Sequence, residues 1–281
     1  MSDVKNILVP IDFSDLSENA LEVAAQIAGR TGASLNVFHM LGLSEAVLAK
    51  DESQEYEEAQ YYMRLANDRF RTFLDKPYLK GIPIAKTIQN YKIFTEINDL
   101  AKEQKIDLVV MGSHGLGAMR GLFVGSNTEK VVRSSEVPVL VIKKRDPDFK
   151  LEKVVYGIDY SVETASAYKR AMQFLAPWQP EIHLTHVTLP HLKFRSTKEV
   201  RQQAELFFSV AHHGDMPPNS KQIHLSDFSI EEGLYTYASE IDADLIVVAT
   251  HGRKGLVHFF QGSIGKELVN HAELPVMTFK C

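Results

Sequence analysis

Glycine and small polar residues gather in residues 112–126, in a pattern typical of anion binding. Gly112 and Gly115 follow an apolar run, and Gly125 with Ser126 opens an amphipathic stretch. Glycines let a backbone approach an anion closely, and the free amides at a helix N-terminus bind it. The segment is therefore a candidate phosphate site, although glycines at turns more often only mark the ends of helices.

Two carboxylates are the other candidates for ligand contact. Asp12 and Asp159 each follow directly on a short apolar run. Ligands of open parallel sheets bind beyond the carboxyl ends of the strands, so both side chains are placed for such a contact. The alternative is structural, because Asp12 and the nearby Ser14 and Ser17 are residue types that also cap helix N-termini.

Other kinds of site lack their signatures. Residues 262–266 end in lysine but continue with Glu267, so they are not a P-loop, and residues 115–117 lack the third glycine of a dinucleotide-binding loop. There is no GxSxG elbow, and Cys281, the only cysteine, has no activating context. We therefore expect no dedicated catalysis.

Most of the 11 histidines lie in the second half of the chain, so a metal site has to be weighed. His183 and His186 are three apart on an expected strand and should face opposite sides of it. Neither HExxH nor a paired Cys/His set occurs. Ordinary surface or core histidines are the favoured interpretation, and we expect no metal.

The chain repeats itself, which fixes the architecture that must position these residues. The matching stretches are residues 6–20 with 153–167, and 106–115 with 243–252. The first match places Asp12 over Asp159 and, at the same offset, His39 over His186. A polar segment, residues 144–148, separates the copies, so we predict domains at residues 1–146 and 147–281.

Each copy alternates short β-branched runs with amphipathic stretches, which predicts a doubly wound α/β domain with a parallel sheet. In the first copy the expected strands are residues 7–11, 35–40, 108–111 and 137–142. A helix should start near Leu16 and end at Gly29 or Gly32, and residues 51–76 should form another helix packed on the sheet. The last strands of the two copies should join them as a pseudo-two-fold pair.

Length and composition fit this organisation. A chain of 281 residues predicts about two domains, and 44% apolar with 24% charged residues is ordinary for a globular protein. The net charge of −5 argues against nucleic acid as a partner. The apolar run of residues 7–11 is too short for a signal peptide or membrane span, so we expect a cytoplasmic protein without membrane contact.

The spacing Gly112-x2-Gly115-x9-Gly125-Ser126, together with Val9-Pro10-Ile11-Asp12, resembles the universal stress protein family in its ATP-binding form. The resemblance spans both copies and implies a tandem member with two Rossmann-like, adenine nucleotide alpha-hydrolase-like domains. It implies ATP as ligand, with or without Mg²⁺. The adenine pocket would be formed by Pro10, Asp12 and the strand end at His39 and Met40, and the ribose and phosphates would fall to Met111, Gly112, Gly115, Gly125, Ser126 and Asn127.

The second copy retains part of this pattern: Asp159, Val187 at the position of Met40, Gly252, Gly262 and Ser263. Ala249 replaces the first glycine, and Gly157 stands at the position of Pro10. We expect the Ala249 methyl to intrude on a ribose and Gly157 to loosen the turn before Asp159. Both changes predict weaker binding in the second copy.

Three functional hypotheses follow from the sequence. The first is a nucleotide-binding stress-response or signalling module without dedicated catalysis. The second is an ATP-hydrolysing or adenylate-using enzyme of the same fold, and the third is a nucleotide-free interaction protein. Pairing of the two domains within the chain is expected, and a homodimer is left open.

Overall fold

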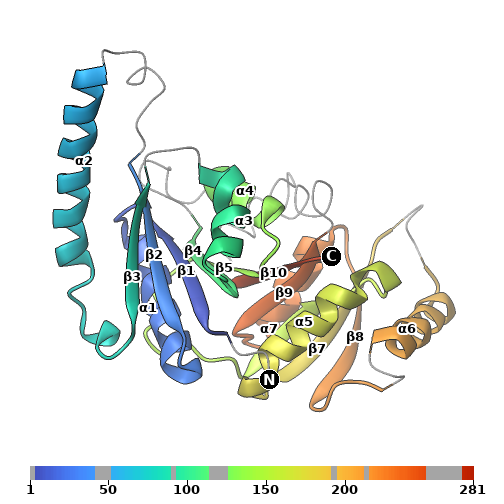
Figure 1. The fold of residues 1–281 in the computed structure, drawn as a ribbon. Helices are drawn as coiled ribbons and strands as arrows, with labels where there is room; N and C mark the ends of the chain where they lie inside the picture. Colours follow the sequence, from blue (N-terminus) through green and yellow to red (C-terminus); the bar gives the residue numbers. More distant parts are fainter. Residues whose placement is uncertain are drawn as a thin grey trace.

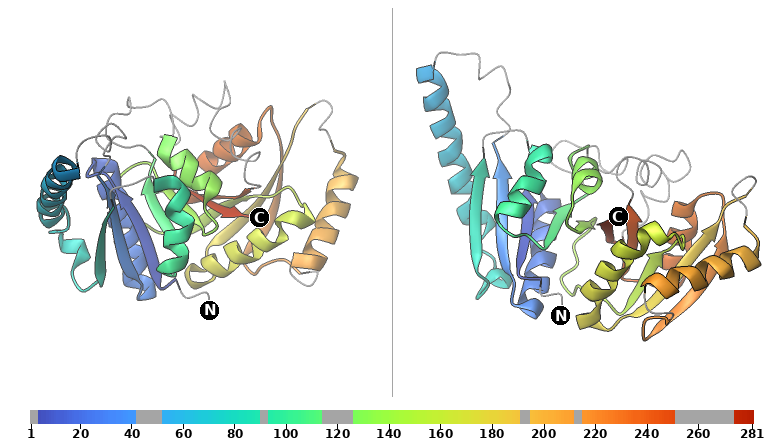
Figure 2. Two further views of the ribbon diagram at one scale, coloured as in Figure 1. Left: turned by 45° about the horizontal axis from the view of Figure 1, so that its top comes forward. Right: turned by 45° about the vertical axis from the view of Figure 1, so that its right-hand side comes forward.

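The two copies share one sheet. The computed structural model describes residues 4–41, 52–89, 93–113, 126–190, 195–211, 215–250 and 274–281. Within these residues, ten strands form a single sheet in the order β3-β2-β1-β4-β5-β10-β9-β6-β7-β8. Helices cover both faces of this sheet (Figures 1 and 2).

The first copy supplies half of the sheet. Its elements are β1 (Asn6–Ile11), α1 (Asp15–Thr31), β2 (Ser34–Met40), α2 (Glu52–Phe73), η2 (Pro77–Leu79), β3 (Ile84–Gln89), α3 (Ile93–Glu103), β4 (Leu108–Gly112), α4 (Ser126–Ser134) and β5 (Val139–Ile142). Its five strands are all parallel to one another. The predicted doubly wound domain is confirmed.

The second copy follows the same plan. Its elements are β6 (Lys153–Gly157), η3 (Val162–Thr164), α5 (Ala165–Leu175), η4 (Ala176–Trp178), β7 (Glu181–Thr188), α6 (Thr197–Ala211), β8 (Ser220–Ser226), α7 (Ile230–Glu240), β9 (Leu245–Thr250) and β10 (Val276–Lys280). The copies meet where β10 pairs antiparallel with β5, with Met277 opposite Leu140. This confirms the pseudo-two-fold pair, in which each apolar terminal strand covers the edge of the other.

The core divides into two apolar layers, one on each face of the sheet. One layer joins α1, α2, α5 and α6 through residues such as Leu21, Phe70 and Phe207. The other joins α3, α4 and α7 through Ile97, Val131 and Leu234. Strands buried on both faces explain why the sequence shows continuous apolar runs rather than alternation.

The structure gives the ends and the buried sides of two predicted helices. Helix α1 continues through Gly29 and ends at Gly32, whose φ of 74° is the left-handed conformation that glycine adopts readily. In α2, Phe70 and Phe73 are buried against the sheet layer, whereas Leu65 is 39% exposed. The helix predicted over residues 51–76 is therefore present, and it runs from Glu52 to Phe73.

The segment between the copies is fixed to α1. The side-chain amide of Gln26 donates to the carbonyl of Asp146 at 2.8 Å and accepts from the backbone N–H of Phe149 at 2.8 Å. Glu22 accepts two hydrogen bonds from the guanidinium of Arg145, at 2.9 and 3.1 Å. The exact division between residues 146 and 147 stays a prediction. None of the helices in the described ranges is long and apolar enough to cross a membrane.

Candidate functional site

Asp12 organises the loop that leads from β1 into α1. One of its carboxylate oxygens accepts hydrogen bonds from the backbone N–H of Ser14 at 3.0 Å and from the Ser14 hydroxyl at 2.6 Å. Ser14 in turn is the N-cap of α1, because its Oγ accepts from the N–H of Ser17 at 3.2 Å. Asp12 is thus not the cap itself; it orients the capping serine at the carboxyl edge of the sheet.

The second copy repeats this loop at Asp159. A carboxylate oxygen of Asp159 accepts from the backbone N–H of Ser161 at 2.9 Å. In both copies the residue after the aspartate is an aromatic with positive φ: 63° at Phe13 and 55° at Tyr160. Non-glycine residues occupy this region at a cost of about 1–3 kcal/mol, so tertiary contacts must hold both turns.

Histidines provide those contacts. The Phe13 ring packs on the ring of His39 with centroids 4.4 Å apart, and Tyr160 stacks on His186 at 5.5 Å. Nδ1 of His39 lies 2.9 Å from the carbonyl of Ile11, and Nδ1 of His186 lies 3.0 Å from that of Ile158. A carbonyl only accepts, so each Nδ1 carries the proton. Each histidine thereby fixes the peptide that precedes the site aspartate.

Burial sets the charge of these histidines. It lowers the pKa of both His39 and His186 from the ordinary 6.5, while the hydrogen bond to the backbone carbonyl opposes the shift. Both rings are therefore neutral at pH 7.

Acid is expected to destabilise the protein through these two rings. Because the folded-state pKa lies below the unfolded value, the unfolded chain binds more protons once the pH falls below about 6.5. The stability is present above that pH and is lost as the pH falls through the folded-state pKa. Urea titrations between pH 7.5 and 5 should show a shallower decline for a His39→Gln, His186→Gln double variant. An unchanged slope would contradict the assignment.

Several of the predicted nucleotide-site residues of the first copy converge. Met40 and Met111, at the ends of β2 and β4, belong to the same apolar layer on the side of α3 and α4. Pro10 shares the side of β1 that carries Leu8 of that layer, because side chains two apart on a strand lie on one face. Strand pairing of β1 with both β2 and β4 brings the three ends together beside Asp12.

Gly112 has a structural role that the sequence did not reveal. A Cβ atom at this position would lie 2.9 Å from the backbone oxygen of Leu16 and 3.0 Å from its carbonyl carbon. The glycine therefore lets the end of β4 lie against the first turn of α1. Thr128, which sequence reasoning missed, donates from Oγ1 to the carbonyl of Gly112 at 2.9 Å and ties the start of α4 to this strand end.

Part of the predicted phosphate segment lies outside the described residues: Gly115 and Gly125 in the first copy, and Gly252, Gly262 and Ser263 in the second. Helix α4 begins at Ser126, and Asn127 in its first turn is exposed. With Thr128 bonded to Gly112, the helix N-terminus lies at the carboxyl edge of the sheet. The partial positive charge of a helix N-terminus favours an anion there.

Helix α7 covers the corresponding edge of the second copy. A Cβ atom at Gly157 would lie 2.8 Å from Cδ1 of Leu234, so the space that Pro10 fills in the first copy holds a leucine. A Cβ atom at Gly233 would lie 2.9 Å from Cγ1 of Val187. The counterparts of Pro10 and Met40 are therefore packed against a helix.

The expected reason for weak binding at Ala249 is wrong. Ala249 packs against the apolar layer of α1 and α5, and the Cβ direction at the equivalent Gly112 points to helix α1. The methyl thus faces the core rather than a ribose. Gly157 likewise serves the packing of Leu234 rather than simply loosening a turn.

The histidines of the second half serve packing in the described part of the chain. Nδ1 of His183 is hydrogen-bonded to the hydroxyl of Tyr237, 2.8 Å away, on the side of the sheet that α7 covers. His186 lies on the opposite face with Tyr160, as the strand spacing predicts. Among the described residues, no three His, Cys, Asp or Glu side chains are grouped to hold a metal ion.

Two doubly wound domains joined edge to edge, each with an ordered aspartate at its carboxyl edge, define a tandem Rossmann-like α/β protein. The universal stress protein family matches the chain twice, over residues 3–143 and 150–280. The chain therefore belongs to the universal stress protein family, in its tandem form.

Relatives of similar length share this organisation. Universal stress protein Slr1230 of Synechocystis is 22% identical over 298 residues, covering 99% of this chain and 100% of its own. Universal stress protein Rv2005c of Mycobacterium tuberculosis is 31% identical over 190 residues, 61% of each chain. The crystal structure of a universal stress protein from Archaeoglobus fulgidus covers 99% of this chain and 97% of its own, with a TM-score of 0.64 at 18% identity, which shows a common fold.

Proposed function

We propose that the first copy binds ATP at the carboxyl edge of β1, β2 and β4, and that this binding is the biochemical activity of a cytoplasmic stress-response module. The observation that carries the proposal is the convergence of Pro10, Met40 and Met111 beside Asp12. Apolar side chains with a few polar groups are the usual lining of a small-ligand site.

The residues present fit an adenine nucleotide. Met40 and Pro10 offer an apolar surface for the base, with Met111 beside them for the ribose, and the carboxylate of Asp12 can accept hydrogen bonds from an amine or hydroxyl. Backbone amides at the start of α4, together with Gly115 and Gly125, would hold the phosphates. Mg²⁺, when bound, would neutralise phosphate charge.

The proposed activity is binding of ATP without dedicated catalysis. Asp12 already accepts two hydrogen bonds from Ser14, so its role is to order the loop and the base rather than to activate water. ATP hydrolysis requires an oriented water and stabilisation of the transferred phosphoryl group. An assay for ADP or AMP release therefore separates this proposal from an enzyme of the same fold.

The proposal is tested on the full chain in two steps. Mass spectrometry of small molecules released from freshly purified, denatured protein should find an adenine nucleotide. Calorimetric titration of nucleotide-free protein with ATP should give saturable binding with about one tight site per chain. Absence of both signals would contradict the proposal and favour a nucleotide-free interaction protein.

A further inference from the structure

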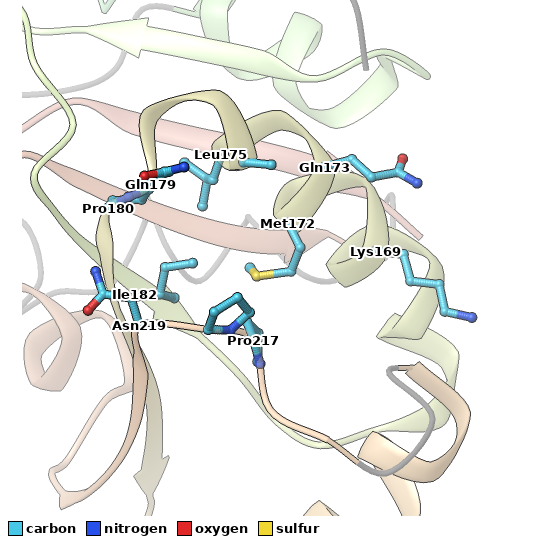
Figure 3. Close-up of a pocket in the computed structure, with 11 residues that line it drawn as sticks. Lys169, Met172, Gln173, Leu175, Gln179, Pro180, Ile182, Pro217 and Asn219 are labelled. Carbon is cyan, nitrogen blue, oxygen red and sulfur yellow. The ribbon is translucent and has the colours of Figure 1, made fainter. Parts of the chain in front are cut away.

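The second copy has a pocket that is remote from the carboxyl edge of the sheet. Its volume is about 720 Å³, and it lies between α5 and the segment that precedes β8. Met172 and Ile182 face Pro217 across the cavity, while Lys169 and Gln173 extend from one side of α5 at its margin (Figure 3). The pocket is within the size range of sites that hold small ligands.

The corresponding space in the first copy is filled by its own chain. Ile84 and Ser220 are equivalent, because they pair with the equivalent residues Leu35 and Ile182. Counting back from these strands places Leu79 opposite Asp215, and Tyr78 opposite Gly214.

The two sets of residues are packed differently. Leu79 is 5% exposed, and Tyr78 packs against the apolar layer of α1. Asp215, by contrast, is exposed. The second copy thus has an exposed charged residue, Asp215, at the position where the first copy has the buried Leu79.

The margin of the pocket also has a counterpart in the first copy. There, Glu22 holds Arg145 of the connecting segment, and Gln26 binds the main chain at Asp146 and Phe149. At the repeat offset, the equivalents of Glu22 and Gln26 are Lys169 and Gln173. The side-chain amide of Gln26 is therefore retained in the second copy, whereas the negative charge of Glu22 is replaced by the positive charge of Lys169.

We propose that the α5 pocket, defined by Lys169, Met172, Gln173, Ile182 and Pro217, is a docking site for an extended peptide segment of a partner protein that carries an acidic side chain opposite Lys169. An acidic side chain of this peptide pairs with Lys169. Its main chain runs along α5 beside Gln173, as the connecting segment runs along α1 beside Gln26. Large apolar side chains of the peptide occupy the pocket, as Tyr78 and Leu79 occupy its equivalent.

Charge and exposure favour this occupant. Lys169 is exposed and forms no ion pair within the described part of the chain. An opposite charge on a partner is attracted to it, whereas a basic partner is repelled. Burial of an aromatic or branched side chain against Met172 and Ile182 supplies the apolar contribution to binding. This site is separate from the proposed nucleotide site and does not depend on it.

The probe is a synthetic peptide with the sequence of residues 143–151 and the change Arg145→Glu. The unaltered 143–151 peptide is its matched control. Trp178 is the only tryptophan, and it follows the pocket residue Ala176 and precedes Gln179 by one position, so its fluorescence is recorded as a first readout. Titrations use the full-length protein, with calorimetry as the second readout.

Wild-type protein is expected to bind the Arg145→Glu peptide about fivefold more tightly than the unaltered peptide. The Lys169→Glu variant should reverse this preference. Lys5→Glu, which changes the net charge equally in the first copy, should leave the preference as in wild type. The same preference in wild type and Lys169→Glu, or no saturable response to either peptide at millimolar concentration, would overturn the proposal.

Discussion

The Gly125→Val variant is expected to lose ATP affinity by at least about a hundredfold, while Gly262→Val retains most of it. A β-branched side chain at Gly125 would block close approach of the backbone to phosphate. Each hydrogen bond to a charged group contributes about 1.5–3 kcal/mol, so losing two of them accounts for a loss of this size.

The asymmetry between the variants rests on the packing of the second copy. Leu234 occupies the space of the Pro10 ring, and Gly233 lies against Val187, so a base would have to displace α7. In the second copy, Ile264 and Gly265 stand at the positions of Asn127 and Thr128. The second copy therefore lacks the hydroxyl with which Thr128 ties α4 to Gly112 in the first copy. The first copy is therefore the one we expect ATP to occupy.

Calorimetric titration of both variants with ATP checks this ranking, because each variant leaves the other copy intact. Far-UV circular dichroism and the thermal midpoint confirm that each is folded. If Gly125→Val bound ATP as tightly as wild type while Gly262→Val lost binding, the second copy would be the occupied one. If both bound as wild type, the phosphate assignment would be wrong.

Much of the architecture could be predicted because it depends on local pattern and repetition. Continuous apolar runs marked the buried parallel strands, and the two copies revealed each other by their match. The antiparallel pairing of β5 with β10 followed from the need to cover two apolar edges. The position of Asp12 at the carboxyl edge could also be predicted, because Asp12 directly follows a strand in the sequence.

What the sequence did not reveal depends on contacts between distant segments. The positive φ of Phe13 is held by His39, which is 26 residues away in the chain, so local propensity gives no sign of it. The glycine at 112 looked like a ligand-binding feature, but its Cβ position is occupied by α1. The closure of the second copy by Leu234 likewise depends on how α7 packs across β6. A duplicated sequence showed which residues to compare, but only the structure showed what surrounds them.

Gly112→Ala is expected to destabilise the protein by about 1–3 kcal/mol, the usual effect of overpacking a tight contact. The added methyl would lie 2.9 Å from the backbone oxygen of Leu16, and backbone cannot rotate away as a side chain can. Relief requires β4 and the first turn of α1 to separate, which also disturbs the loop at Asp12. ATP affinity should therefore fall together with stability.

Gly29→Ala is the matched control, because it adds the same methyl to an exposed turn of α1 with no atom within 4 Å. Both substitutions reduce the entropy of the unfolded chain equally, so the difference between them isolates the contact with Leu16. Gly29→Ala should stabilise the protein by about 0.5–1 kcal/mol, since alanine is the better helix former. Urea and thermal unfolding of the two variants should thus move in opposite directions. Equal stability of the two variants would mean that the β4–α1 contact relaxes without cost. The glycine at position 112 would then be required for ligand binding rather than for packing.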